Sequence, residues 1–260
     1  MPSSRKAPKQ WGFDDNYAGD IATGTAKRSG PNSVTYLSET ATSYEVGLRY
    51  ETDDQKLQLG AAGYYVRVKD LQVGVFNGNT NFVVGNADSR SYGVEAFVNL
   101  RPVRGLSING LFSYVDAKYT RFTGAACTAA QSIAMSPCSQ DLSGTPVPVP
   151  DLMFNLAASY KLEVGDYLIS TRASWNYRAA YNFSDTQDPL LDRPSVSLVD
   201  ASIGFGPRDE RWEFSVFAKN MLNERWSNIG GSTPLVRGTV FSDTQRPFQV
   251  GARMRVRFGN

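Results

Sequence analysis

Residues 248–258 read FQVGARMRVRF, a stretch in which apolar side chains occupy every second position. The positions between them carry Gln249, Gly251, Arg253, Arg255 and Arg257. A helix would mix these two kinds of side chain on one surface, whereas a strand sends successive side chains to opposite faces of a sheet. The stretch therefore predicts a β-strand with one apolar face and one strongly charged face.

The same alternation recurs along most of the chain, and no segment shows a comparable helical periodicity. Most of the alternating runs span about nine to eleven residues, the length with which a tilted strand crosses a bilayer. The alternative, a soluble β-sandwich, also alternates, but its strands usually have about five or six residues. The further alternating segments are residues 44–51, 57–65, 92–100, 106–114, 152–162, 167–177, 199–205 and 212–218.

The connections between these segments alternate in length. Short charged turns lie at 52–55, 101–105, 163–166 and 206–211, and long polar loops lie between them at about 67–90, 117–150, 178–196 and 220–247. An up-and-down barrel of the outer membrane has this pattern, with tight periplasmic turns and long extracellular loops. The sequence therefore predicts an all-β protein, an antiparallel up-and-down transmembrane β-barrel.

Aromatic residues collect at both ends of the predicted strands, as they do at the two interfaces of a membrane. At the turn ends they are Tyr50, Tyr160, Phe205, Trp212 and Phe258. At the loop ends they are Tyr44, Tyr65, Tyr114, Trp175, Tyr177 and Phe248. These two belts bracket an aliphatic band, which places the apolar face against lipid and the arginines in a polar interior.

The composition excludes several classes of protein. The 260-residue chain contains no histidine, which excludes Ser-His-Asp and Cys-His catalysis and His-ligated zinc or haem within it. It has no P-loop and no GxGxxG motif after a strand. Its net charge of +2, without a basic cluster, argues against nucleic-acid binding. We expect no enzyme activity, no catalytic residues, no metal site, no cofactor and no nucleic-acid partner.

Several segments resemble the C-terminal barrel of TonB-dependent outer-membrane receptors. They are TSYEVGLRYE at 42–51, VVGNADSRSYGVEAFVNLRP at 83–102, FAKNMLNERW at 217–226 and RPFQVGARMRVRF at 246–258. The resemblance covers residues 41–260, and residues 1–40 would add a partial strand and an extracellular loop. Such receptors close a barrel of about 22 strands around a plug, of which this chain would supply about nine or ten. The resemblance implies a Gram-negative outer membrane and import of ferric siderophores, cobalamin or sugars, driven by TonB through the plug.

The chain departs from this family because no plug, TonB-contacting box or signal peptide is recognisable in it. A partial barrel would leave unpaired strand edges in lipid, where each unsatisfied backbone group costs several kcal/mol. We therefore expect the C-terminal part of a longer receptor that imports a scarce nutrient, foremost a ferric siderophore, and that is not transport-competent alone. Its implied partners are outer-membrane lipid, the barrel assembly machinery, the siderophore, and the TonB complex acting through the missing plug. The alternative is a small self-contained passive pore.

Both cysteines, Cys127 and Cys138, lie in the long loop at 117–150. Cell-surface loops are in an oxidising compartment, where an even pair of cysteines in one loop is typical of a disulfide. In the loop-entropy model, closing the short segment between them would stabilise the loop by about 2–3 kcal/mol. We predict a disulfide here, with free thiols as the alternative.

The long loops also carry aromatic and cationic residues that would suit an anionic, aryl-bearing ferric siderophore through stacking and charge pairing. The alternative is that they pack loop against loop or sit in the aromatic belt. We expect the interior arginines Arg172, Arg253, Arg255 and Arg257 to pair with acids on adjacent strands or on a plug. The candidate ligand contacts are Tyr119, Arg121, Phe122, Tyr181, Phe183, Trp226 and Arg237.

Overall fold

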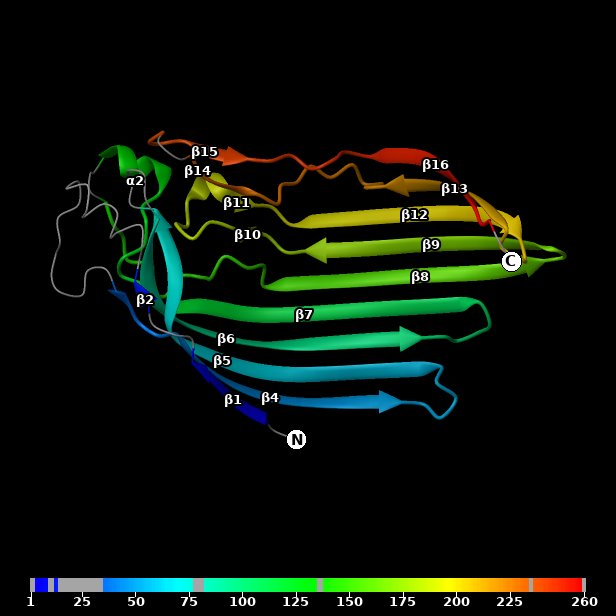
Figure 1. The fold of residues 1–260 in the computed structure, drawn as a ribbon, viewed down its shortest axis with the longest axis horizontal. Coiled ribbons are helices and arrows are strands. Elements are labelled where there is room, and N and C mark those ends of the chain that lie inside the picture. The colour runs from blue at the N-terminus through cyan, green and yellow to red at the C-terminus, as the bar shows by residue number, and fades with distance from the viewer. Residues whose placement is uncertain are drawn as a thin grey trace.

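The computed structural model describes residues 3–8, 12–13, 35–76, 82–134, 138–233 and 236–258. Its main feature is one ten-stranded antiparallel sheet in which neighbouring strands follow each other in chain order (Figure 1). The strands are β1 (Ser3–Pro8), β4 (Thr40–Glu51), β5 (Leu57–Phe76), β6 (Phe82–Leu100), β7 (Leu106–Arg121), β8 (Leu152–Val164), β9 (Tyr167–Arg178), β12 (Val196–Pro207), β13 (Trp212–Lys219) and β16 (Gln249–Val256). The predicted all-β, antiparallel up-and-down architecture is confirmed.

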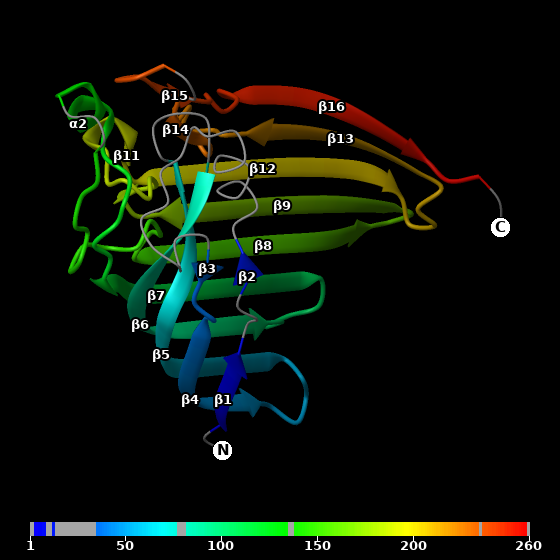
Figure 2. The same cartoon turned by 60° about the vertical axis from the view of Figure 1, so that its left-hand side comes forward.

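The sheet is curved, and its two ends differ. Short turns join the strands at one end, while the long connections gather at the other (Figures 1 and 2). In the part of the chain that the structure describes, β1 pairs with β4 alone and β16 with β13 alone, so these two strands form the edges. The described sheet is therefore an open section of a barrel wall.

The strand register sorts the side chains onto two faces. On one face Phe214 pairs with Phe205 and with Met254, and on the other face Ser215 pairs with Gly204 and with Arg253. The apolar face is exposed over much of its area, with Val46 66% exposed and Val250 66% exposed. A soluble protein would bury such a face, whereas a membrane wall presents it to lipid. The alternation in residues 248–258 thus produces the arrangement that it predicts.

Aromatic side chains form the predicted bands at both ends of the apolar face. At the loop end Tyr44 pairs with Tyr65, and Tyr65 in turn pairs with Tyr92. At the turn end the ring of Phe205 stacks on Tyr167 at a centroid distance of 4.9 Å and meets the edge of Trp212 at 5.9 Å. These rows mark where the two membrane interfaces cross the wall.

The strands β5, β6 and β7 run further than the alternation predicts. The loop predicted at about 67–90 is wrong, because β5 continues to Phe76 and β6 begins at Phe82. A register shift between Val68 and Leu71, with Asp70 at a φ of 55°, inserts a bulge in β5. A bulge bends a strand and breaks the alternation of its side chains, which hides the extension from a search for period two. Figure 2 shows this part of β5 and β6, drawn in cyan, turning away from the rest of the sheet.

Small elements occupy the loop end. Helix α2 (Ala129–Ala134) lies between β7 and β8, and β10 (Tyr181–Asn182), the 3₁₀ turn η1 (Pro189–Leu191) and β11 (Asp192–Arg193) lie between β9 and β12. Within the described residues, no helix combines the length and apolar character needed to span a bilayer. The two remaining pairs are β14 (Gly230–Ser232) with β15 (Val240–Ser242), and β2 (Gly12–Phe13) with β3 (Thr35–Tyr36).

The N-terminal segment contributes to the sheet as well as to the loop end. Strand β1 pairs in register with β4 from Ser3 opposite Glu45 to Pro8 opposite Thr40. The partial strand and loop expected at residues 1–40 fall largely outside the described residues, which include only 3–8, 12–13 and 35–40 of that range. A boundary at residue 40 stays a prediction.

Candidate functional site

The loop end has its own small core, formed where the loop at 117–150 folds over the extended strands. Tyr119 and Phe122 are 4% and 2% exposed, and their ring centroids lie 4.9 Å apart. Around them pack Ala87 of β6 and the loop residues Ala125 and Leu142. Two of the candidate ligand contacts are therefore packing residues in this structure, which is the alternative that the sequence left open.

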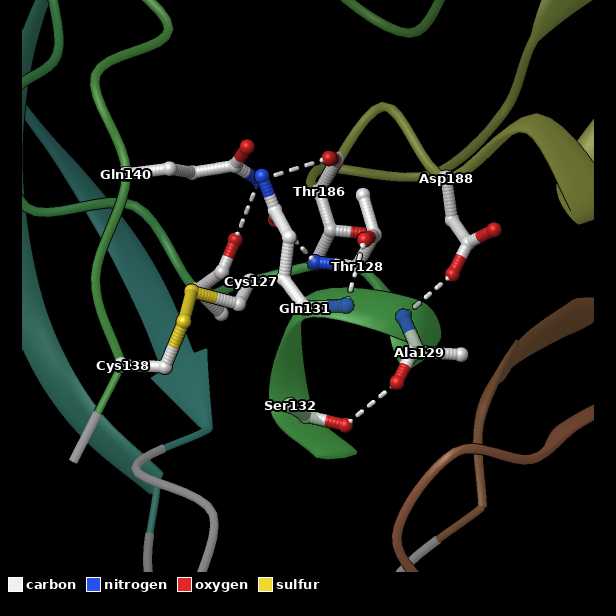
Figure 3. Close-up of a disulfide and its surroundings, with 10 residues drawn as sticks. Cys127, Thr128, Ala129, Gln131, Ser132, Cys138, Gln140, Thr186 and Asp188 are labelled. Atoms are coloured by element: carbon white, nitrogen blue, oxygen red, sulfur yellow. Dashed lines mark hydrogen bonds between the residues drawn. A yellow bond between two sulfur atoms is a disulfide. The ribbon is translucent and has the colours of Figure 1, made fainter. Parts of the chain in front are cut away.

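A disulfide joins Cys127 to Cys138 and closes the segment that contains α2 (Figure 3). The helix begins with a reciprocal capping arrangement, since the Thr128 amide donates to Gln131 Oε1 at 2.9 Å and the Gln131 amide donates to Thr128 Oγ1 at 3.2 Å. The covalent link and the cap both restrain the start of α2.

Two side chains tie this segment to the loop between β9 and β12 (Figure 3). The Ala129 amide donates to Oδ2 of Asp188 at 2.6 Å, and Asp188 is 2% exposed. The Gln140 side-chain amide donates to the carbonyl oxygens of Ala126 at 2.6 Å and Thr186 at 2.8 Å. These hydrogen bonds thus connect the loop at 117–150 to the loop between β9 and β12 at the loop end of the sheet.

Arg121, another candidate ligand contact, is engaged at the bulge of β5. Its Nε donates to Asp88 Oδ2 at 2.9 Å, and its Nη2 donates to Asp70 Oδ1 at 3.1 Å. The guanidinium group therefore bridges β7 to β5 and β6. This fork of hydrogen bonds stabilises the bulged extension, so Arg121 has a structural partner before any ligand arrives.

The remaining aromatic candidates gather around arginines that the sequence did not single out. Arg178, the last residue of β9, lies over the Tyr181 ring at 5.1 Å from its centroid and over the Trp226 ring at 5.8 Å. The Nε and Nη2 atoms of Arg178 are buried and have no hydrogen-bond partner among the described residues. Arg193 lies 4.0 Å from the Phe183 centroid. The structure therefore brings Tyr181 and Trp226 together on one cation.

Arg178 could have been found from two features of the sequence. In the alternation it continues the polar set Arg172, Ser174 and Asn176, and it directly follows the run at 167–177. A cation at that position, followed by Tyr181 in the loop, is a signal for a stacked guanidinium.

The last candidate ligand contact, Arg237, lies in the turn between β14 and β15. This turn packs close to α2, since a Cβ on the neighbouring Gly238 would come within 2.2 Å of Ile133.

The polar face of the wall is strongly basic towards the turn end. A hollow of about 1140 Å³ there is lined mainly by cations and small polar residues, with Asp200 and Glu213 as its acids. Arg255 Nη1 lies 3.8 Å from Glu213 Oε2, and Arg257 Nη1 lies 2.9 Å from Glu210 Oε2, so two of the four interior arginines pair with acids as predicted. Arg172 and Arg253 form no salt bridge with an acid that the structure describes, and Arg253 instead lies 5.6 Å from the centroid of the Phe217 ring. The cations of the hollow are Lys56, Arg101, Arg104, Lys161, Arg172, Lys219, Arg253 and Arg255.

The described residues contain no group of three or more His, Cys, Asp or Glu side chains arranged to hold a metal ion. The candidate functional features of the wall are the cation–aromatic cluster of Arg178, Tyr181 and Trp226 at its loop end and the basic hollow on its polar face. The first could hold an anionic aromatic ligand, and the second could hold an acidic protein surface.

Comparison with known proteins identifies relatives of this wall. A family model described as "TonB dependent receptor-like, beta-barrel" matches residues 4–221. The pesticin receptor of Yersinia pestis is 25% identical over 205 residues, which is 78% of this chain and 27% of that protein. The chain thus spans about a quarter of the length of this curated relative.

Solved structures share the fold. The ferric yersiniabactin uptake receptor FyuA from Yersinia pestis superposes with a TM-score of 0.72 at 18% identity, over 99% of this chain and 34% of that one. The siderophore receptor PiuA from Acinetobacter baumannii superposes with a TM-score of 0.65 at 14% identity, over 97% of this chain and 32% of that one.

Proposed function

Because the chain belongs to the family of TonB-dependent receptor β-barrels, we propose that it forms part of the wall of an importer whose cargo is a ferric siderophore. It is a protein of the Gram-negative outer membrane. Two proteins of the same fold carry names that refer to such cargo, a ferric yersiniabactin uptake receptor and a siderophore receptor. These names support the choice of ligand class for this chain.

The observation that carries the proposal is the cluster of Arg178, Tyr181 and Trp226. The guanidinium group lies over both aromatic rings, and its buried Nε and Nη2 have no hydrogen-bond partner in the described chain, which leaves two charged donors for an anion that reaches them. The rings beside it offer flat apolar surfaces to an aryl group. Among the candidate ligand contacts, Tyr181, Trp226 and Phe183 are therefore favoured over Tyr119 and Phe122, which are buried in the loop core.

The basic hollow on the polar face supports a second partner. Its cations outnumber Asp200 and Glu213, so an acidic surface would bind there by charge complementarity. We infer that a plug with an acidic flank packs against β12, β13 and β16. The TonB complex would then act on that plug, and this wall would provide the surface against which the plug moves.

The open edges of the described sheet support a role within a larger barrel. Backbone groups on the outer sides of β1 and β16 would be unpaired in lipid, which membrane proteins avoid by closing the barrel. We propose that further strands complete the wall, that the barrel assembly machinery inserts it, and that transport requires the complete receptor. The mass and N-terminal sequence of the protein in isolated outer membranes test this point. A species of 28.6 kDa that folds and conducts alone would contradict it.

The cargo proposal is tested by uptake of radioactive iron from a panel of ferric siderophores into cells that carry the whole receptor. For Arg178→Gln we expect roughly tenfold weaker uptake of one aryl-bearing member, since one charged hydrogen bond is worth about a factor of ten. Arg208→Gln, in a turn at the opposite end, is the matched control and should leave uptake unchanged. Unaltered uptake by Arg178→Gln, at equal receptor abundance, would rule out this cluster as the ligand site.

A further inference from the structure

The apolar face carries a row of cations immediately outside its loop-end tyrosines. One step beyond the tyrosine row on the same face, Arg67 of β5 pairs with Arg90 of β6, and Arg90 pairs with Lys118 of β7. Residues two apart on a strand share a face, so these side chains belong to the lipid-facing side with Tyr65 and Tyr92. We call Arg67, Arg90 and Lys118 the basic row.

The charges of the basic row are only partly neutralised by the protein. Arg67 is exposed, and neither Arg67 nor Arg90 forms a salt bridge with any residue that the structure describes. Arg90 lies over the Tyr92 ring at 5.3 Å from its centroid, and Lys118 Nζ lies 3.6 Å from Asp116 Oδ2. Three cations thus face one carboxylate.

Two further charged groups, Asp88 and Lys69, lie beside the basic row. Asp88 lies near Arg67 but is occupied by Arg121, at 2.9 Å. On β5 the next outward position is Lys69, which is exposed and pairs with Thr40. The basic row together with Lys69 therefore carries a net positive charge.

An apolar groove lies directly below the basic row. It has a volume of about 480 Å³, and Gly63 lies in it between Val46 and Val94, which are its register partners on β4 and β6. Five tyrosines also line it, and a Cβ on Gly63 would meet no atom closer than 3.9 Å. The groove is thus open above the glycine, at the depth where lipid chains meet their headgroups. The tyrosines are Tyr44, Tyr64, Tyr65, Tyr92 and Tyr114.

We propose that the basic row and this groove together bind a phosphorylated lipid of the outer leaflet. The long loops mark the extracellular side, so the row meets the headgroups of that leaflet. Strands are spaced about 4.8 Å apart, so the three cations span roughly 10 Å, within reach of two phosphates on one headgroup. Guanidinium groups bind phosphate oxygens in pairs of hydrogen bonds, and one acyl chain lies over Gly63. The proposal rests on the outer-membrane location and is independent of the cargo.

Lipid is the occupant that this position favours. A soluble anion would meet the same cations but would gain nothing from the apolar groove beneath them. An acidic protein would have to approach through the headgroup layer, because the row lies on the face that continues into Val46 and Val94 rather than on the polar face. The neighbouring charge and apolar surface match the two parts of one amphipathic molecule.

The test uses the whole receptor purified from outer membranes in detergent, with bisphosphorylated lipid A as the probe and native mass spectrometry as the readout. The variant is Arg67→Gln/Arg90→Gln/Lys118→Gln. The matched control is Arg208→Gln/Arg211→Gln/Arg257→Gln, which removes equal charge at the turn end and outside the basic hollow. We expect the basic-row variant to lose at least roughly tenfold in affinity, the worth of about one charged hydrogen bond. The control should bind as the unaltered receptor does, and heat-modifiable gel migration establishes that both variants are folded.

Further measurements distinguish a phosphorylated lipid from free phosphate as the ligand of the basic row. Lipid A stripped of its phosphates should bind weakly to every variant, and millimolar inorganic phosphate should not displace the intact lipid. Gly63→Leu, which fills the groove, should weaken lipid binding while the basic row is intact. The proposal is overturned if the basic-row variant retains the lipid, if removal of the phosphates has no effect, or if inorganic phosphate competes equally well.

Discussion

Asp243 organises the loop that joins β13 to β16. Its Oδ1 accepts hydrogen bonds from Ser227 Oγ at 2.6 Å and from the amides of Asn228 at 2.8 Å and Ile229 at 3.0 Å. The Gln245 side-chain amide donates to its other oxygen. These donors, led by the Ser227 hydroxyl, lower the pKa of Asp243 from 3.8 to about 2.

This depressed pKa predicts acid sensitivity of the loop. A carboxyl whose pKa is lower in the folded state stabilises that state fully above its ordinary pKa of 3.8, and the contribution disappears as the pH falls towards about 2. We expect the fluorescence of Trp226, whose carbonyl accepts from the Gln245 amide, to change between about pH 4 and pH 2. In Asp243→Asn this change should be absent, and an identical transition in that variant would refute the assignment.

For single residues, the sequence identifies candidate ligand contacts by residue type better than it predicts where each of them lies in the fold. Tyr181 and Trp226 are recognisable as loop aromatics, but the cation that joins them, Arg178, belongs to a strand. Tyr119 and Phe122 look equally available in the sequence, yet both are buried. Which loop aromatic becomes core depends on packing between segments distant in the chain, and periodicity carries no information about that.

Among the elements, the segment around α2 depends on a residue from another loop. Asp188 accepts from the Ala129 amide at the start of α2 and from the Leu190 amide at the start of η1. It therefore caps two elements at once, from a nearly fully buried position.

We expect Asp188→Ala to destabilise the packed loops that contain α2 and η1 by about 1–3 kcal/mol, because two amides lose their acceptor and one of them is buried. Hydrogen exchange of the segments 126–134 and 184–192 measures the effect, and both should become less protected together. Asp151→Ala, at an exposed carboxylate near the start of β8, is the control. If only one of the two segments loses protection, the loops are not coupled through Asp188.

The elements also show where prediction from the sequence succeeds and fails. The central parts of the strands follow from alternation, since one face meets lipid and the other a wet interior. The extensions of β5 and β6 do not, because the bulge at Asp70 reverses the phase and the residues beyond it face a loop core instead of lipid. The hydrogen bond from Ala129 to Asp188 spans 59 positions and leaves no local signature.

For the whole molecule, the two faces of the wall predict opposite effects of an arginine substitution on folding in the membrane. Ala157 and Ala158 are adjacent in the middle of β8, and they pair with Asn109 on the polar face and with Ile108 on the apolar face, respectively. Arginine at a lipid-facing position in mid-membrane costs about 2–4 kcal/mol. We expect Ala158→Arg to reduce the folded fraction in outer membranes sharply, and Ala157→Arg to be tolerated. Equal loss in both variants, measured by heat-modifiable migration, would contradict the assignment of faces.

The sequential order of the sheet has a consequence for how such a wall changes over generations. In the described ten-stranded sheet, each strand pairs only with the sheet strands that precede and follow it in the chain, so a hairpin can be gained, lost or exchanged without changing any other strand pair. A single added strand would instead invert every strand that follows it and move the later loops to the opposite side of the membrane. Lineages of this wall should therefore lengthen and shorten by whole hairpins. Their outer loops can meanwhile diversify on a scaffold that stays the same.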